Sequence, residues 1–292
     1  MALEALIDRT VEKPDQIVIV NGGDERSDKI AHDYASKTDI QIEVINTVNK
    51  NLATSRNIGL GHCTGDIVAM TDDDAEVLPD WVTQMKKAHA EHPEAGGVGG
   101  AVLGSDSNKS LLSRIADTAV FSSPASPAYV RTLPGVNVSY KRAVLKLVGL
   151  QDESLFRGED VDFNWRIKKL GYEIFYTPAI KVIHHHRPTM NGMVRQFFMY
   201  GRAYYHVRGK WPEMYCVYPH GIHSLRDLVK AGFFFAAIIY RPINNSLLMK
   251  TWMDRLGALF ILFLNQIAWR GGMVYEKFHF FVRKSDGSVV TL

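Results

Sequence analysis

The chain has 292 residues, of which 46% are hydrophobic and 22% are charged, which is typical of a globular protein and excludes a disordered one. It has two cysteines, Cys63 and Cys216, far apart in the sequence, so we expect no disulfide framework, no cysteine metal site and a reducing compartment. Residues 1–180 carry 19 Lys and Arg against 26 Asp and Glu (−7), and residues 181–292 carry 15 against 5 (+10), so the two parts are expected to face different partners.

The first 188 residues alternate between helical and strand patterns. Helices are predicted at residues 2–11, 27–36, 51–63 and 79–91, and strands at residues 16–20, 40–45, 66–70 and 96–103. Such βαβ alternation predicts an α/β fold with a mainly parallel sheet and helices on both faces.

The remaining residues, 189–292, have a different pattern. A helix is predicted at residues 190–209, followed by apolar stretches at residues 231–240 and 256–269 that basic residues flank. The first stretch is shorter than the roughly 20 residues that span a bilayer, and polar residues interrupt the second. We expect helices that lie in or dip into an anionic membrane interface. A buried helical pair or a dimer interface is the alternative, and no motif for nucleic acid accompanies the charge.

Two acidic clusters stand out. Asp72, Asp73 and Asp74 follow the apolar strand at residues 66–70, where open α/β sheets bind ligands. Oxygen ligands of this kind suit Mg²⁺ or Mn²⁺, which hold phosphate oxygens in turn. The alternative is a solvated turn that caps the next helix. The second cluster is Glu159 and Asp160.

Several segments in this order resemble the family 2 glycosyltransferases, which are inverting enzymes with the Rossmann-like GT-A fold. The segments are residues 17–24, 51–59, 65–74, 135–142, 158–166 and 184–187. The resemblance covers about two thirds of the chain. It implies a GT-A glycosyltransferase domain over residues 1–188 and a helical, membrane-associated region over residues 189–292.

The resemblance implies a metal site. The D-x-D pattern of the family falls on Asp72 and Asp74, with Asp74 as the first choice of metal ligand and Asp72 or Asp73 facing the ribose. His184 or His186 could complete the site or contact the diphosphate. A Mg²⁺ or Mn²⁺ ion held there would neutralise the nucleotide-diphosphate leaving group.

The resemblance also implies the catalytic residues. Asp160, in the pair with Glu159, matches the base that deprotonates the acceptor hydroxyl. Two adjacent carboxylates raise one another's proton affinity, which suits a base near neutral pH. The alternative for both is a role in the first turn of the following helix.

Further positions match the binding residues of the family. Those expected to bind the donor are Asn21, Asp24, Arg56, Asn57, Asp72, Asp73 and Arg187. Those expected on the acceptor side are Gly135, Asn137 and Trp165. Taken alone, Arg56 would be read as an exposed helical arginine.

Two features depart from the family pattern. Gly22 stands where the family usually has an aspartate that binds the nucleobase, and Asp24 could replace it. The family also begins with an apolar central strand, whereas Met1 directly precedes what would be the first helix. Either the start is misassigned, or the chain is truncated, or part of the donor site is lacking.

Together these observations predict a metal-dependent, inverting hexosyltransferase at the cytoplasmic face of the cell membrane. It would move a sugar from a nucleotide-sugar to a hydroxyl of a glycan or a lipid-linked acceptor, as in polysaccharide biosynthesis. One alternative is a non-catalytic relic of the same fold that binds nucleotide-sugars. Another is a metal-dependent nucleotidyltransferase, for which the expected glycine-rich loop is not found.

Overall fold

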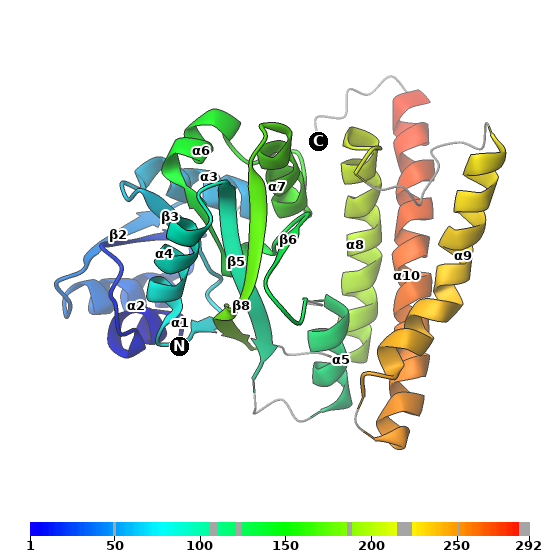
Figure 1. The fold of residues 1–292 in the computed structure, drawn as a ribbon, viewed down its shortest axis with the longest axis horizontal. Helices are drawn as coiled ribbons and strands as arrows, with labels where there is room; N and C mark the ends of the chain where they lie inside the picture. Colours follow the sequence, from blue (N-terminus) through cyan, green and yellow to red (C-terminus); the bar gives the residue numbers. More distant parts are fainter. Residues whose placement is uncertain are drawn as a thin grey trace. The chain divides into compact units, whose positions relative to one another are not determined.

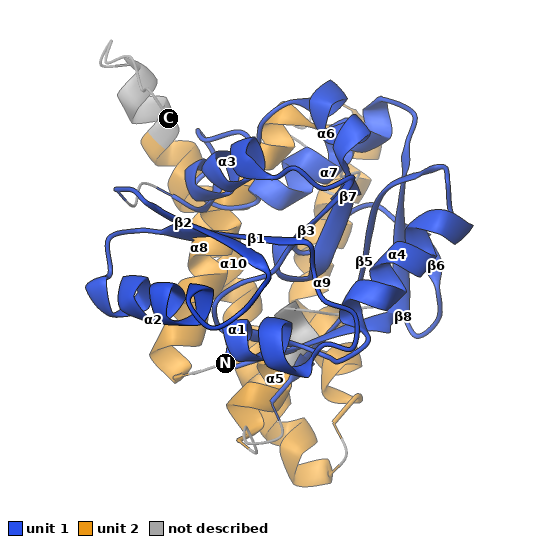
Figure 2. Cartoon of the chain, turned by 90° about the vertical axis from the view of Figure 1, so that its left-hand side faces the viewer, with its two compact units in different colours: residues 1–105, 123–185 blue, residues 106–122, 186–292 orange. Residues whose placement is uncertain are grey.

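The computed structural model describes residues 1–48, 51–105, 110–120, 124–185, 189–214, 224–249 and 251–285. The chain forms two compact units, which are drawn in different colours in Figure 2. Unit 1 comprises residues 1–105 and 123–185, and unit 2 comprises residues 106–122 and 186–292. Residues 106–122 therefore group with the C-terminal helices. The division into functional domains at residues 1–188 and 189–292 stays a prediction.

Unit 1 begins with the alternation of helices and strands that the sequence predicts (Figure 1). Its elements are α1 (Ala2–Glu4), η1 (Ala5–Arg9), β1 (Gln16–Asn21), α2 (Glu25–Ala35), β2 (Gln41–Asn46), α3 (Leu52–His62), β3 (Ile67–Met70), β4 (Ala75–Val77), α4 (Trp81–Glu91) and β5 (Ala95–Gly104). The side chains of Asp24 and Asn51 cap α2 and α3, because they accept the backbone N–H groups of Ser27 and Thr54.

The second part of unit 1 adds shorter elements. They are β6 (Ala128–Val130), η2 (Gly135–Asn137), β7 (Val138–Lys141), α6 (Arg142–Val148), α7 (Glu159–Lys169) and β8 (Glu173–His184).

The strands form two sheets in the described part of the chain. Strands β1 and β2 pair in parallel, and a six-stranded sheet has the order β3-β7-β5-β8-β4 with β6 also paired to β8. Only β5 and β8 are parallel in this larger sheet, and the other pairs are antiparallel. The prediction of a mainly parallel sheet was therefore wrong in this detail, because the antiparallel partners are not consecutive strands joined by a single helical crossover.

Glycines allow β5 to lie close to its neighbours. A Cβ atom on Gly99 would lie 2.2 Å from the carbonyl oxygen of Asn137, and one on Gly100 would lie 1.9 Å from that of Ile180. A side chain at either position would therefore push β5 away from the backbone of Asn137 or of Ile180.

Unit 2 consists of helices in its described residues. They are α5 (Leu111–Val120), α8 (Met190–Lys210), α9 (Leu225–Ser246) and α10 (Trp252–Ser285). Helix α10 packs against α8 and α9, as Figure 1 shows, and also against α5. Its core includes Ile115, Phe197, Ala258 and Leu262. Helix α8 confirms the helix predicted at residues 190–209.

A cavity of about 1540 Å³ lies in unit 1 and is lined by every residue of β1 and β3. Among the described strands, β1 pairs with β2 alone and β3 with β7 alone. Met1, Ala2, Leu3 and Leu6 also line the cavity. The cavity is partly open to solvent and lies beside the unpaired edges of these two strands in the described part of the chain. The absence of a first strand nevertheless stays a prediction.

Candidate active site

The aspartate run forms a turn between two strands. Asp72, Asp73 and Asp74 connect β3 to β4, and the N–H of Ala75 donates to the carbonyl of Asp72 at 3.2 Å. Strand β4 is antiparallel to β8, with Ala75 opposite His184. The N–H of His185 donates to the carbonyl of Asp74 at 3.0 Å. This ladder therefore brings the end of β8 to the aspartate turn.

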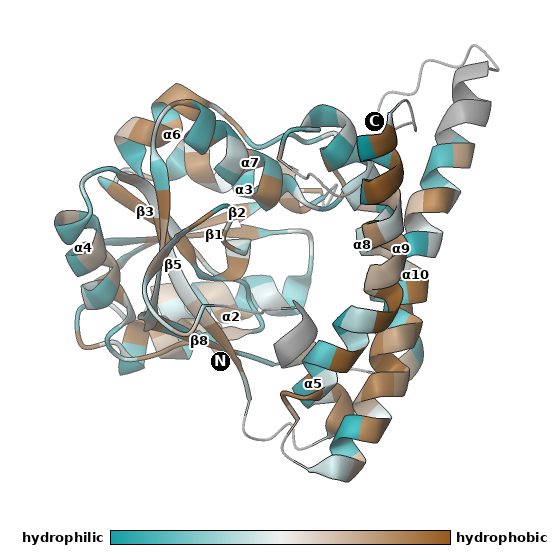
Figure 3. Ribbon diagram, turned by 45° about the vertical axis from the view of Figure 1, so that its right-hand side comes forward, coloured by the Kyte–Doolittle hydropathy of each residue, from teal (hydrophilic) through white to brown (hydrophobic). Residues whose placement is uncertain are grey.

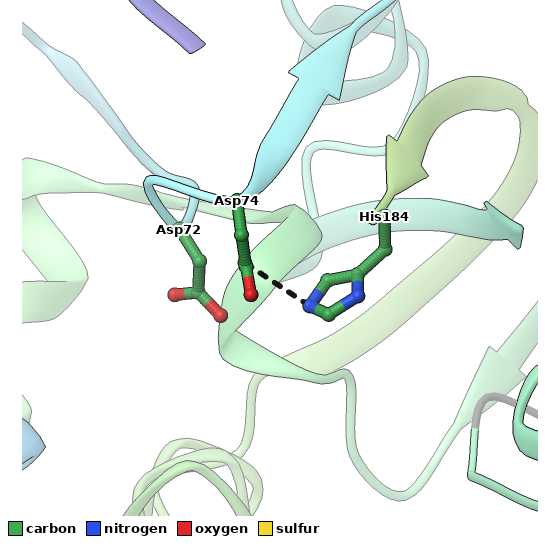
Figure 4. A group of neighbouring side chains, drawn as sticks. All are labelled: Asp72, Asp74 and His184. Carbon is green, nitrogen blue, oxygen red and sulfur yellow. Dashed lines mark ion pairs between the residues drawn. The ribbon is translucent and has the colours of Figure 1, made fainter. Parts of the chain in front are cut away.

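Three side chains converge at this place (Figure 4). Ligand atoms of Asp72, Asp74 and His184 all lie within 4.8 Å of one another. His184 Nε2 is 3.2 Å from Asp74 Oδ1, and the side chain of Asp74 is 51% exposed. Two carboxylates and one imidazole form a set of donors that fits Mn²⁺ or Mg²⁺. His186, the other histidine predicted for this site, lies outside the described residues.

Arg56 links this group to the second acidic cluster. Its Nη2 donates to Asp72 Oδ1 at 3.2 Å and its Nη1 to Glu159 Oε1 at 2.8 Å. The Arg56 side chain is only 10% exposed, so it is not the exposed helical arginine of the alternative interpretation. Burial alone would lower the pKa of Arg56, but the carboxylates of Asp72 and Glu159 outweigh burial and raise it. Arg56 therefore stays charged.

Glu159 and Asp160 are the first two residues of α7, which confirms their position in a first helical turn. Gly158 precedes them with a φ of +80°, a conformation that favours glycine. The Glu159 side chain is 6% exposed. Burial raises the pKa of Glu159, the neighbouring charge of Asp160 raises it further, and Arg56 opposes both. A role in the helix turn and a role in catalysis are compatible at this site.

Asp160 makes different contacts from Glu159. Its Oδ2 accepts the backbone N–H of Gly135 at 3.2 Å, and its Oδ1 accepts that of Val161 at 2.7 Å. These bonds fix the direction of a half-buried carboxylate. The hydrogen bonds of the Arg56 guanidinium go instead to Asp72 and Glu159.

Gly135 lies directly against Arg56. A Cβ atom at this position would lie 2.4 Å from both Nη1 and Nη2 of Arg56. The sequence predicts Gly135 on the acceptor side of the site. In the structure the group that approaches this backbone is the guanidinium of Arg56. A direct role for Gly135 toward an acceptor stays a prediction.

Most of the predicted donor residues line one cavity. Asn21, Asp24, Arg56, Asp72 and Asp73 line the cavity of about 1540 Å³, together with Asp74. Asn21 holds the turn after β1, because its amide donates to the carbonyl of Asp24 at 2.9 Å and to Asn46 Oδ1 at 2.8 Å. Arg187 lies outside the described residues.

Other predicted binding residues are not among those that line this cavity. The amide of Asn57 is buried and bonds to Gln151 and Glu153. Asn137 is fully buried and bonds to Trp81, Ala101 and Ile180. Both amides thus hold strands and loops of the core together. Their predicted contacts with substrate, and that of the half-buried Trp165, stay predictions that this packing does not favour.

A sequence comparison decides the family. The profile described as glycosyl transferase family 2 matches residues 2–138. These residues belong to this family. The match includes the aspartate turn and Arg56, whereas Glu159, Asp160 and His184 lie beyond its end.

Relatives of this chain include glycosyltransferases of archaea and bacteria. Glucosyl-dolichyl phosphate glucuronosyltransferase of Haloferax volcanii is 33% identical over 101 residues, which are 35% of this chain and 32% of that protein. Pre-mycofactocin glycosyltransferase of Mycobacterium tuberculosis is 27% identical over 160 residues, which are 52% of this chain and 34% of that protein. The matched part thus spans about a third of the length of these relatives.

A solved structure shares the fold. The mannosyltransferase PcManGT from Pyrobaculum calidifontis, solved with GDP-Man and Mn²⁺, aligns with a TM-score of 0.59 and 16% sequence identity. The alignment covers 91% of this chain and 80% of that chain. The prediction of an α/β GT-A fold is therefore confirmed, with a mixed sheet.

One group of side chains beside the aspartate turn was not predicted from the sequence. Arg9 Nη2 is 2.7 Å from Glu76 Oε2, and His185 Nε2 is 2.7 Å from Glu76 Oε1. These contacts fix the last residues of β8 on the side opposite His184. Glu76 lies in β4 opposite Ile183, which is two residues from His185, so the side chains of Glu76 and His185 share a face.

Proposed function

We propose that this chain is an inverting glycosyltransferase that moves a sugar from a nucleotide-sugar to an acceptor hydroxyl. The observation that carries the proposal is the convergence of Asp72, Asp74 and His184 on one side of Arg56 and of Glu159 on the other. A donor diphosphate needs cationic neutralisation and an acceptor needs a base. The structure provides candidates for both within one connected group of side chains.

Asp72, Asp74 and His184 would hold a Mn²⁺ or Mg²⁺ ion. When bound, such an ion neutralises charge on a diphosphate leaving group. The fit rests on their mutual distances within 4.8 Å. Burial and the nearby Asp74 carboxylate raise the pKa of Asp72, and Arg56 lowers it. The structural neighbour PcManGT was solved with Mn²⁺ and GDP-Man, which supports this choice of ion and of donor class.

Asp160 is proposed as the catalytic base. Glu159 already forms an ion pair with Arg56 at 2.8 Å, which ties its carboxylate to binding and positioning. Asp160 is held by two backbone N–H groups and can take the proton of an acceptor hydroxyl as that oxygen attacks the anomeric carbon. Attack from the face opposite the departing diphosphate gives inversion.

The proposed acceptor is a glycan or a lipid-linked sugar at the cytoplasmic face of a membrane. The name of the Haloferax volcanii relative contains a dolichyl phosphate, and unit 2 contains one helix long and apolar enough to cross a membrane by length and composition. Both support an acceptor with a lipid anchor. A hexose is the proposed transferred group.

Donor hydrolysis tests the proposal. The purified chain is mixed with a panel of UDP- and GDP-sugars and Mn²⁺, and release of the nucleoside diphosphate is measured with and without EDTA. Metal-dependent release from at least one donor is expected. If donors bind but none of them releases a nucleoside diphosphate, the non-catalytic alternative that binds nucleotide-sugars with the same fold replaces the enzyme.

A further inference from the structure

Helix α3 carries a second polar residue, next to Arg56, that the proposed chemistry does not use. Asn57 is only 7% exposed. Its Oδ1 accepts the backbone N–H of Gln151 at 2.8 Å, and its Nδ2 donates to the backbone carbonyl of the same residue at 2.9 Å. Two hydrogen bonds to the backbone of one residue fix both its distance and its orientation. Asn57 therefore holds the chain at Gln151 against α3.

The same helix also holds Glu153. Nδ2 of Asn57 donates to Glu153 Oε1 at 2.9 Å, and Oγ1 of Thr54 donates to Glu153 Oε2 at 3.0 Å. Nδ2 of Asn51 donates to the backbone carbonyl of Glu153 at 2.8 Å. Asn51, Thr54 and Asn57 are spaced three residues apart, so they are neighbours on the helix surface. These three residues form the α3 clamp, which holds Gln151 and Glu153.

Arg166 fastens the residues just before this clamp to α7. Its Nη1 donates to the carbonyl of Val148 at 2.7 Å and its Nη2 to that of Leu150 at 2.8 Å. Its Nε donates to Asp162 Oδ2 of the same helix at 2.9 Å, which orients the guanidinium. Leu150 is thus bonded to α7 and Gln151 to α3. This stretch therefore joins the two helices, which lie at the same end of unit 1 in Figure 3.

The two joined helices carry groups that the proposed reaction needs. Arg56 directly precedes Asn57 and pairs with Glu159 at 2.8 Å, and Asp160 follows Glu159 in α7. An ion pair is a single point of contact, about which α7 could turn. A second attachment between the same helices fixes the direction of the Asp160 carboxylate. Such precision matters, because a misplacement of about 1 Å in an active site can cost about a hundredfold in rate.

We propose that Asn57 is a positioning residue that fixes the Asp160 carboxylate through the α3 clamp and Arg166. The inference rests on the proposed function, in which Asp160 is the base. It gives Asn57 a role other than the donor contact expected from the sequence. Nδ2 of Asn57 already has two acceptors and its Oδ1 has one donor, so a donor molecule would compete with bonds that hold the loop.

Hydrogen–deuterium exchange of the full chain without substrate tests the positioning directly. The N–H of Val161 lies in the first turn of α7, where backbone N–H groups have no partner within the helix, and it donates to Asp160 Oδ1 at 2.7 Å. Its exchange rate therefore reports on the place of that carboxylate. We expect Asn57→Ala to raise the exchange rates of Gln151 and Val161 about tenfold or more.

Ser139→Ala is the matched control. It removes a buried hydroxyl of unit 1 that is bonded to His89 and to the carbonyl of Val98, and it should leave both exchange rates unchanged. Asn57→Asp should behave like Asn57→Ala, because a carboxylate cannot donate to Glu153 and the two charges repel. Adding Glu153→Gln should restore part of the protection, since the new amide can donate to that carboxylate.

Kinetics separate positioning from donor binding. For the UDP- or GDP-sugar that the parent chain hydrolyses with Mn²⁺, we expect Asn57→Ala to lower kcat about tenfold or more and to leave the Kd of the nucleoside diphosphate unchanged. Unchanged exchange of Val161 in Asn57→Ala, or equal acceleration in Ser139→Ala, would overturn the proposal. So would a raised Kd with the exchange rates of the parent chain, which would return Asn57 to donor binding. Absence of hydrolysis by the parent chain would count against the proposed function, and the exchange rates would still test the clamp.

Discussion

Arg56 and Glu159 form a buried ion pair with an N–O distance of 2.8 Å, although they are 103 positions apart in the sequence. The second Nη atom of the same guanidinium reaches Asp72 at 3.2 Å. One cation thus joins the aspartate turn after β3 to the first residue of α7. Several properties of the site depend on this cation.

Loss of Arg56 should destabilise the fold. We expect Arg56→Met to lower the free energy of unfolding by roughly 3–5 kcal/mol, because it leaves Glu159 charged, buried and unpaired. Chemical denaturation monitored by circular dichroism measures this. The double variant Arg56→Met/Glu159→Gln should recover much of the loss, and an equal loss in both variants would contradict the explanation.

The same variant should be sensitive to pH. The pKa of Glu159 lies above its usual value in the folded chain because of burial and the charge of Asp160. Between the unfolded and folded pKa values the folded state therefore holds the extra proton, and stability falls as pH rises through this window. Without Arg56, which lowers this pKa, the window extends upward. The destabilisation by Arg56→Met should be larger at about pH 8 than at about pH 5, and a loss independent of pH would refute this.

Gly135→Ala should displace Arg56 without removing any charge. The new Cβ would lie 2.4 Å from the guanidinium nitrogens, so the side chain must leave Glu159 or Asp72. We expect weaker nucleotide binding and a loss of stability of roughly 1–3 kcal/mol. Gly61→Ala is the matched control, because a methyl group there would meet no neighbouring side chain within 4 Å. This variant should raise the free energy of unfolding by up to about 1 kcal/mol, since alanine favours the helical conformation of α3 more than glycine does.

Asp74→Asn should abolish metal-dependent donor turnover and leave the fold intact. Asp74 is half exposed and its carboxylate lies beside His184, so the amide removes a ligand charge without opening the core. Turnover with Mn²⁺ and thermal melting are both measured. The control Asp33→Asn removes the same charge from an exposed position of α2. Full activity of Asp74→Asn in the presence of EDTA would end the metal hypothesis.

The outline of unit 1 could be predicted from local sequence signals. The caps at Asp24 and Asn51 and the apolar runs at β1 and β3 are local, so their helices and strands appear where the sequence places them. The pairing of β4 with β8 is not local. It sets His184 beside Asp74, yet β4 has only three residues and no period that could identify it.

The burial of polar side chains could not be predicted from the sequence either. Asn137 and Arg56 are polar residues that a sequence pattern assigns to a surface or to a ligand. Their partners, Trp81 for Asn137 and Glu159 for Arg56, come from distant elements. A motif can therefore nominate such residues, but only the packing distinguishes a side chain that holds the site together from one that can face a substrate.

Asp160→Asn should lower kcat by several orders of magnitude and change the donor Kd little. The amide keeps the size of the side chain and can still accept the N–H of Gly135, but it cannot take a proton from an acceptor hydroxyl. Donor binding is measured by calorimetry and turnover by product release. A large loss of nucleotide affinity with turnover preserved would reassign Asp160 to binding.

The last prediction concerns the cavity between β1 and β3. Each strand has one paired edge in the described part of the chain, and all their residues line a volume of about 1540 Å³. Unpaired backbone groups and unfilled apolar space each cost stability, and a typical domain has only about 5–15 kcal/mol to lose.

An apolar segment of about 5–6 residues with a short turn, fused ahead of Met1, should therefore enter this space as a strand. Met1 and Leu3 line the cavity, so a fused segment starts at its wall. We expect the melting temperature to rise by roughly 10 °C and donor binding to tighten. A fused segment of equal length made of Ser and Asn is the control, because it can pair but cannot fill apolar space. If the chain as written already melts cooperatively at high temperature, binds donor at micromolar concentration and gains nothing from the apolar segment, another part of the protein fills this position and the predicted absence of a first strand is wrong.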